Sequence, residues 1–148
     1  MSDRILVPVD FSDVTEAVLA EVAAIAKAYG AKVWLIHVAA PEPSFIGYEV
    51  GPVFIREDVA EQLRQQHQKL QQYQQLLREQ SVETTAMLVP GDPARKIPEE
   101  AARLQPRLIV LGSHGHGALH QLLAGSVCQA VLKQRLCPVL VVPAPARE

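Results

Sequence analysis

The sequence contains few cysteines and no long hydrophobic run. Its two cysteines, Cys128 and Cys137, form no C-x-x-C motif, which excludes a disulfide framework and a zinc module, so we expect buried or partly buried thiols. Asp10 interrupts the first apolar run well before it reaches the length of a signal peptide core or a membrane span. We therefore expect a cytoplasmic protein without a membrane partner.

The sequence also lacks an excess of charge of either sign. It has 14 Lys and Arg against 16 Asp and Glu, a formal net charge of -2, so no global basic field exists and a general nucleic-acid binder is disfavoured. Hydrophobic residues make up 49% of the 148 residues, which is enough to build a core and excludes wholesale disorder. A chain of this length predicts one domain over residues 1–148.

Five short apolar runs alternate with longer helical stretches. Their continuous apolar character is typical of strands that are covered on both faces, and the alternation predicts βαβ units with right-handed crossovers. The sequence therefore predicts an α/β fold with a parallel sheet. The five predicted strands are Ile5–Val9, Val33–Val38, Ala86–Val89, Leu108–Leu111 and Val139–Val142.

Helix signals separate these strands. Apolar residues at helical spacing from Val14 to Ala26 predict a first helix, with Ser12 or Asp13 as its N-cap and Gly30 as its end. Too many prolines and glycines lie in residues 39–53 for a regular element, so this stretch is a long loop, either mobile or functional.

The next stretch, residues 54–80, is rich in glutamine. It keeps an apolar series that includes Leu63, Leu70 and Leu77, so we interpret it as a helix that covers the sheet and exposes a glutamine face. A coiled-coil partner is a less favoured alternative, because the series lapses at Gln66.

A third helix begins at Gly91-Asp92-Pro93, where the sequence supplies a turn, an N-cap and a proline suited to the first helical position. Pro98 then falls inside this helix and lacks a backbone donor. We expect a kink or a restart near Glu99.

The fourth predicted strand runs directly into a glycine-rich loop, Gly112-Ser113-His114-Gly115-His116-Gly117, and Gly125-Ser126 follows. Backbone without Cβ atoms can approach a ligand closely, and Ser126 suits the N-cap of a helix over Val127–Arg135, whose free N–H groups would face the same place. This pattern favours a phosphate site, although a mobile turn would also explain the glycines. The G-x-x-x-x-G-K-[ST] and G-x-G-x-x-G motifs are both absent.

The spacing Gly112-x-x-Gly115, nine residues, then Gly125-Ser126 resembles the signature of nucleotide-binding universal stress proteins. The similarity covers almost the whole chain, from Ile5-Leu-Val-Pro-Val-Asp10 through His37-Val38 to Cys137-Pro-Val-Leu-Val-Val142. It implies an open five-stranded sheet of order 3-2-1-4-5 with helices on both faces. ATP, or another adenine nucleotide, would then bind at the carboxyl edge between the first and fourth strands.

The resemblance also implies roles for single residues. The adenine and ribose side would comprise Pro8, Val9, Asp10 and Val38, and the phosphate side would comprise Leu111, Gly112, Ser113, His114, Gly115, His116, Gly125, Ser126 and Val127. Simpler roles remain open for some of them. Asp10 could only cap a turn, Ser126 could only cap a helix, and Pro8 and Val9 could belong to the core.

Residues 112–127 contain no Lys or Arg, so we expect Mg²⁺ to accompany the nucleotide. His116 and His120 could share a helix face, yet no nearby carboxylate or cysteine completes a zinc shell, so a protein-held metal is disfavoured. His116 is instead a possible donor to phosphate.

These residues are compatible with three functions. No positioned nucleophile and base are present, so fast hydrolysis is not expected and an ATP-binding stress-response switch is favoured. The alternatives are a dimeric scaffold that uses no nucleotide and a phosphotransfer or adenylate-forming enzyme. The last predicted strand would expose an apolar edge, and the resemblance implies a homodimer through Val139, Leu140, Val141 and Val142.

Overall fold

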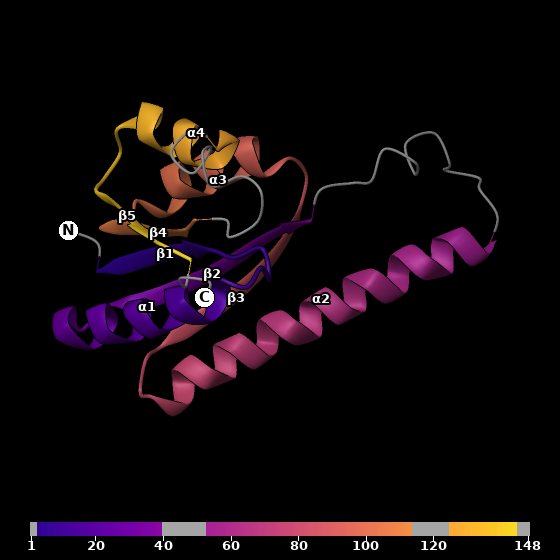
Figure 1. The fold of residues 1–148 in the computed structure, drawn as a ribbon, viewed down its shortest axis with the longest axis horizontal. Helices are drawn as coiled ribbons and strands as arrows, with labels where there is room; N and C mark the ends of the chain where they lie inside the picture. The colour runs from indigo at the N-terminus through magenta and orange to yellow at the C-terminus, as the bar shows by residue number, and fades with distance from the viewer. Residues whose placement is uncertain (1–2, 40–52, 114–124, 145–148) are drawn as a thin grey trace.

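The computed structural model describes residues 3–39, 53–113 and 125–144, with residues 53–58 described in the backbone only. Five parallel strands form one sheet in the order β3-β2-β1-β4-β5, as the sequence predicts (Figure 1). The strands are β1 (Arg4–Pro8), β2 (Lys32–Ala39), β3 (Thr84–Pro90), β4 (Leu108–Gly112) and β5 (Val139–Val142). The helices are α1 (Thr15–Tyr29), α2 (Val53–Glu79), α3 (Pro93–Leu104) and α4 (Ser126–Gln134).

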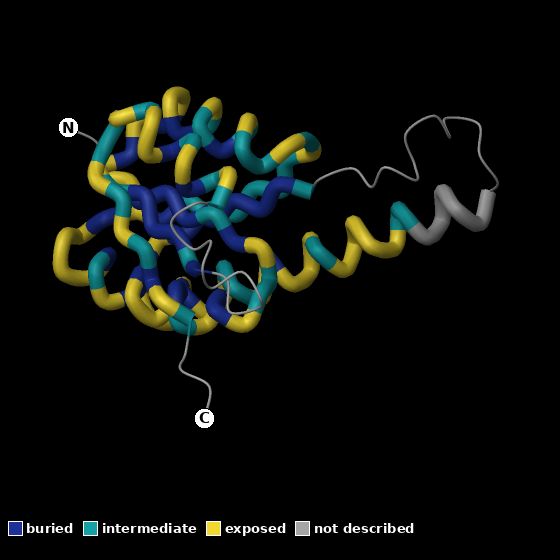
Figure 2. Tube along the Cα trace, turned by 45° about the horizontal axis from the view of Figure 1, so that its top comes forward, coloured by how far each residue is buried: buried dark blue, intermediate teal, exposed yellow. Residues whose placement is uncertain are grey.

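Helices cover both faces of the sheet. One face packs against α1 and α2 through a cluster that includes Val22, Leu70 and Leu77, and the other packs against α3 and α4 through Ile97 and Val131. Successive strand residues alternate between these two clusters, so the central strands are apolar on both sides (Figure 2). This double burial explains why the strands could be found as continuous apolar runs.

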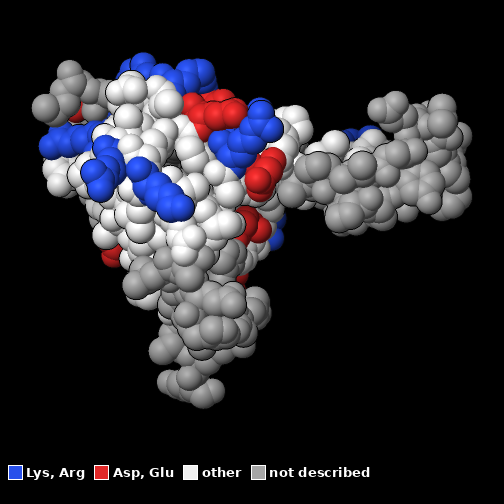
Figure 3. Space-filling view, turned by 90° about the horizontal axis from the view of Figure 1, so that it is seen from above, with Lys and Arg blue, Asp and Glu red and all other residues white. Residues whose placement is uncertain are grey.

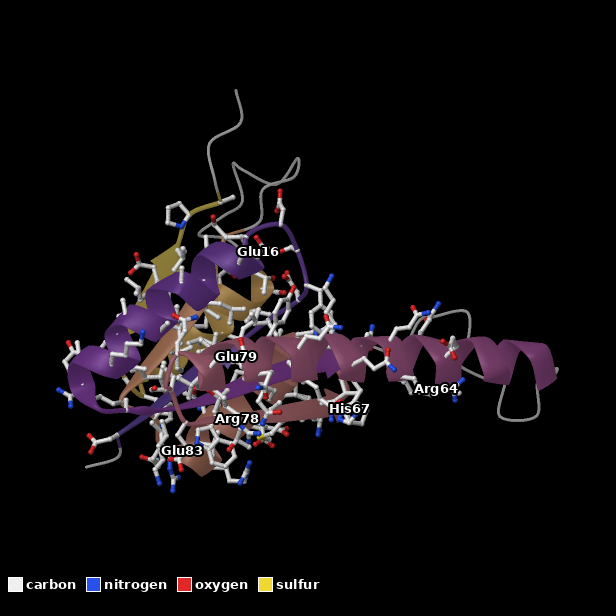
Figure 4. The ribbon with its side chains drawn as sticks, turned by 90° about the horizontal axis from the view of Figure 1, so that it is seen from below. Glu16, Arg64, His67, Arg78, Glu79 and Glu83 are labelled. Atoms are coloured by element: carbon white, nitrogen blue, oxygen red, sulfur yellow. The ribbon has the colours of Figure 1, made fainter. Side chains whose placement is uncertain are left out.

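Helix α2 covers the sheet with only part of its length. Leu70 and Leu77 are fully buried, whereas Leu63 is 40% exposed, and the helix extends beyond the sheet toward its N-terminal end (Figures 1 and 2). Figure 4 shows Arg64 on this extension and Arg78 against the sheet. The predicted sheet-covering helix is therefore confirmed for its C-terminal half, while the predicted apolar position Leu63 does not reach the core.

The first helix starts later than the sequence predicts. Neither Ser12 nor Asp13 is its N-cap: α1 begins at Thr15 after Val14, and no side chain caps it. The Ser12 backbone N–H donates to Asp10 Oδ1 at 3.0 Å, and the Ser12 carbonyl accepts from the Thr15 N–H at 3.1 Å. A turn closed by Asp10 thus replaces the expected cap. The end at Gly30 is confirmed, with φ of 64°.

The third helix runs through Pro98 as one continuous element, so of the expected kink or restart near Glu99 the restart is wrong. Asp92 caps the start as predicted, its Oδ1 accepting from the Ala94 N–H at 3.3 Å. Ile97, Ala101 and Leu104 bury one face of the helix on the sheet, and Gln134 Nε2 donates to the Pro98 carbonyl at 2.8 Å. Packing of this face outweighs the loss of one backbone hydrogen bond.

Gly112 allows β4 and α1 to pack closely at the carboxyl edge of the sheet. A Cβ at this position would lie 2.6 Å from Val14 Cγ1 and 2.9 Å from Val18 Cγ2. Both valines are buried, so neither side chain can swing into solvent. The first glycine of the sequence signature is therefore required by packing within the protein, whatever else it does.

We predict that Gly112→Ala destabilises the protein by about 1–3 kcal/mol, because the added methyl group overpacks this contact. Urea denaturation followed by circular dichroism measures the change. Combining Gly112→Ala with Val14→Ala should recover much of the loss relative to the sum of the single variants, since the second substitution removes the clashing methyl group. An alanine variant as stable as the original chain would contradict the packing explanation.

Candidate functional site

A cavity of about 330 Å³ opens at the carboxyl edge of the sheet, where β1 and β4 lie side by side and the strand order reverses. This is the position at which ligands bind in open α/β sheets. The structure brings together ten of the residues that the sequence assigned to a nucleotide site. These lining residues are Pro8, Val9, Asp10, Val38, Leu111, Gly112, Ser113, Gly125, Ser126 and Val127.

The remaining three predicted residues, His114, Gly115 and His116, lie outside the described residues. In the part of the chain that is described, no three His, Cys, Asp or Glu side chains lie close enough together to hold a metal ion. The described wall of the cavity contains no Lys or Arg.

Backbone N–H groups at the start of α4 provide the polar end of the cavity. Gly125 is the N-cap, with no side chain capping the helix, and the first helical bond runs from the Gln129 N–H to the Gly125 carbonyl at 2.9 Å. The N–H groups of Ser126, Val127 and Cys128 therefore have no acceptor inside the helix. All three residues line the cavity, so the positive end of the helix dipole faces it.

Ser126 is the first residue of α4 and not its N-cap, which corrects the sequence prediction. A glycine precedes it with φ of -58° and ψ of 141°, and among the described residues no side chain makes a capping hydrogen bond to this helix end. A serine at the cap would satisfy one of the free N–H groups with its own hydroxyl. With glycine there, the cap residue has no side chain that competes for those groups.

Apolar side chains also line the cavity, mainly from strand ends. Val9 and Val38 are buried at the ends of β1 and β2, and Ile97 of α3 lines the cavity as well. Such a surface suits a flat, weakly polar group such as a nucleobase. The cavity wall therefore combines apolar side chains with backbone hydrogen-bond donors.

Asp10 contributes the carboxylate of the described wall. The side chain also closes the turn to Ser12, so the capping role that the sequence left open is present. The carboxylate is exposed and lines the cavity at the same time, and a carboxylate there can accept from sugar hydroxyls.

Sequence reasoning missed His37 as a wall residue, although it noted the pair His37-Val38 at the end of a strand. The ring is buried, and its Nδ1 lies 2.8 Å from the Val9 carbonyl. A carbonyl oxygen only accepts, so Nδ1 carries the hydrogen and donates it. The Val9 N–H also donates to the Ile36 carbonyl at 2.9 Å, so both polar backbone groups of Val9 are held.

Other missed wall residues come from elements that the topology brings to this edge. Val14, Thr15 and Val18 belong to the start of α1 or directly precede it, and Pro93 begins α3. Because α1, α3 and α4 each follow a parallel strand, their starts lie at the carboxyl edge, and this rule could have identified these residues. Val141 joins them from β5, where the sequence assigned it to a dimer contact.

Cys128 also lines the cavity and is buried, whereas Cys137 lies partly buried near the start of β5. Burial raises the pKa of the Cys137 thiol, and a backbone hydrogen bond from Ile109 opposes this in part. Both cysteines are free thiols in the structure, as the sequence predicts.

Comparison with known proteins gives the class of this chain. Residues 1–143 match the model of the universal stress protein family. A universal stress protein of Methanocaldococcus jannaschii is 34% identical over 146 residues, covering 98% of this chain and 84% of the relative. The chain belongs to the universal stress protein family.

Solved structures support the same fold. Another universal stress protein of that organism superposes with a TM-score of 0.80 and 29% identity, covering 97% of each chain. The universal stress protein of Archaeoglobus fulgidus in complex with dAMP superposes with a TM-score of 0.65 at 24% identity, covering 93% of this chain and 95% of that one. At that identity the second match shows a shared fold.

Ser113 holds the segment after β5, although it also lines the cavity. Its hydroxyl is buried and accepts from the Ala144 N–H at 2.8 Å, and its own N–H donates to the Val142 carbonyl at 2.9 Å. The side chain is thus committed to the fold.

We predict that Ser113→Ala lowers the free energy of unfolding by about 1 kcal/mol, because the Ala144 N–H loses its acceptor. Hydrogen exchange at Ala144 should speed up more than exchange within β1. Ser126→Ala is the matched control, since the Ser126 side chain is exposed and has no hydrogen bond among the described residues. Equal effects of the two substitutions would contradict the assigned role.

Proposed function

We propose that this protein is an adenine-nucleotide-binding member of its family, with ATP and Mg²⁺ as the ligand pair, and that it acts as a stress-response switch. The observation that carries the proposal is one cavity that joins an apolar pocket of strand ends to the free N–H groups of α4. A nucleotide has the same two-ended chemistry, with a flat base at one end and phosphoryl oxygens at the other.

Within the proposed site, the base packs between Val9, Val38 and Ile97, and the phosphates meet the N–H groups of residues 126–128. Asp10 accepts from the ribose hydroxyls. Because the described wall has no cation, a bound Mg²⁺ supplies the positive charge that balances the phosphates. The complex of the Archaeoglobus fulgidus relative with dAMP supports an adenine nucleotide as the ligand.

A switch requires that occupancy favours one conformation or one partner over another. We place this activity in the cytoplasm and expect binding without fast turnover. Among the described residues, no helix has the length and apolar character needed to cross a membrane. On the face that carries α3 and α4, basic and acidic side chains lie together, as in the pairs Arg95–Glu99 and Arg103–Glu100 (Figure 3).

We predict that Gly125→Val weakens ATP binding by at least about tenfold, because a branched side chain at the cap covers the free N–H groups of α4. The backbone angles of Gly125 are allowed for any residue, so we expect the Gly125→Val variant to fold. Ala130→Val places the same branched side chain on α4 outside the cavity wall and serves as the control. Isothermal titration calorimetry measures both variants.

Repeating the same titrations in EDTA tests whether Mg²⁺ contributes to ATP binding. The expected result is a marked loss of ATP affinity without Mg²⁺, and equal affinity in both conditions would refute the proposed role of the ion. Undiminished binding by a folded Gly125→Val variant would refute the phosphate assignment.

We also propose a homodimer through β5. This strand pairs with β4 on one side and with no described strand on the other, while Leu140 is 36% and Leu132 of α4 is 50% exposed. An apolar open edge of this kind is a surface for pairing. The opposite edge is different, because Arg78 and Gln74 of α2 donate to the outward Thr84 carbonyl of β3.

Leu140→Lys should therefore weaken self-association by at least about tenfold, since it places a charge in the apolar contact. Leu76→Lys is the matched control, because Leu76 is 50% exposed on α2, on the face opposite to α4. Sedimentation velocity over a range of concentrations measures both variants. A wild-type chain that stays monomeric at all concentrations would exclude this contact.

A further inference from the structure

Phe11 has a backbone conformation that phenylalanine rarely adopts. Its φ is 62°, in the left-handed region, and it directly follows Asp10 of the cavity wall. A bulky side chain in this region is strained, so the surroundings must hold it there. The residues that contact the Phe11 ring therefore show which elements the turn after β1 packs against.

The ring of Phe11 lies between the cavity and α2. On one side it stacks on His37, with ring centroids 4.3 Å apart and an angle of 34°. On the other side its centroid is 6.0 Å from that of Tyr73, and Lys69 Nζ lies 5.7 Å from it. His37 lines the cavity, whereas Tyr73 and Lys69 belong to α2 and do not.

These contacts sit where α2 leaves the sheet. Toward the C-terminus, Leu77 is buried and Arg78 and Gln74 bind the Thr84 carbonyl. Toward the N-terminus, residues 61–69 are exposed except for Gln66, which is half-buried. The contacts that hold this part of α2 against the body therefore come from Tyr73, Leu70, Lys69 and the half-buried Gln66.

The polar groups at this junction are not all satisfied. Among the described residues, Ser12 Oγ on the loop and Gln66 Oε1 on α2 are buried without a hydrogen-bond partner. Buried acceptors of this kind raise the energy of the docked arrangement. Together with the strained Phe11, they oppose the docked arrangement of α2 and reduce the free energy that holds it in place.

We propose that the contact from His37 through Phe11 to Tyr73 couples occupation of the cavity to the docking of α2. A ligand that touches Val9, Asp10 or His37 favours the loop conformation in which these groups form the wall. That conformation is also the one that holds Phe11 against Tyr73, so the ligand stabilises the docked α2. This inference rests on the proposed nucleotide site and identifies the element that responds to it.

Hydrogen exchange on the full-length protein, with and without ATP and Mg²⁺, tests the coupling. ATP should slow exchange of backbone amides in residues 66–74 by at least about threefold and leave the anchored residues 75–79 nearly unchanged. Tyr73→Phe keeps the ring and should keep the response. Tyr73→Ala should bind ATP within about twofold of the original chain, because Tyr73 is outside the cavity wall, and should lose the response.

Phe11→Asn is a second test that does not depend on truncating α2, because asparagine tolerates the left-handed region. It should keep ATP binding and lose the protection of residues 66–74. Calorimetry on the same samples separates the two proposals. Bound ATP without slower exchange in α2, or a full response in Tyr73→Ala, overturns the coupling alone, whereas an absence of ATP binding overturns the nucleotide site and the coupling together.

Discussion

The close approach of β4 to α1 is the constraint on which the cavity edge depends. Gly112 has room for no side chain because Val14 and Val18 fill the space where its Cβ would lie. This contact sets the distance between the end of β4 and the start of α1, both of which contribute to the cavity wall. The sequence pattern assigns Gly112 to phosphate binding, but packing already requires glycine at this position. Any role of Gly112 in a ligand site follows from the shape that this packing creates.

The cavity combines apolar side chains with backbone hydrogen-bond donors. Strand ends bring apolar side chains such as Val9 and Val38, and the helix start at Gly125 brings N–H groups that have no acceptor within the helix. Parallel strands that all end at one edge make this meeting a property of the fold. The particular chemistry then depends on few choices, chiefly glycine at the cap of α4 and Asp10 at the turn after β1.

Much of this could be predicted from the sequence, and the errors have physical causes. The strands are recognisable because both of their faces are buried, and ten residues that the family resemblance assigned to a nucleotide site line one cavity. The start of α1 was misplaced because the left-handed Phe11 and the Asp10 turn leave no periodic signal. The effect of Pro98 on the continuity of α3 was overestimated, because local helix propensity takes no account of the packing of Ile97 and Ala101. His37 was missed because a buried histidine in a strand looks like any core residue until its neighbours are known.

The two edge strands of the sheet, β3 and β5, differ in how readily a strand of another copy could pair with them. Arg78 and Gln74 obstruct β3 at its first residue, and Pro90 at its last residue has no N–H to offer. In the proposed dimer through β5, the two β3 edges would face outward, and these groups would hinder a further strand from pairing at either end of β3. Such an edge opposes growth of the pair into a longer stack.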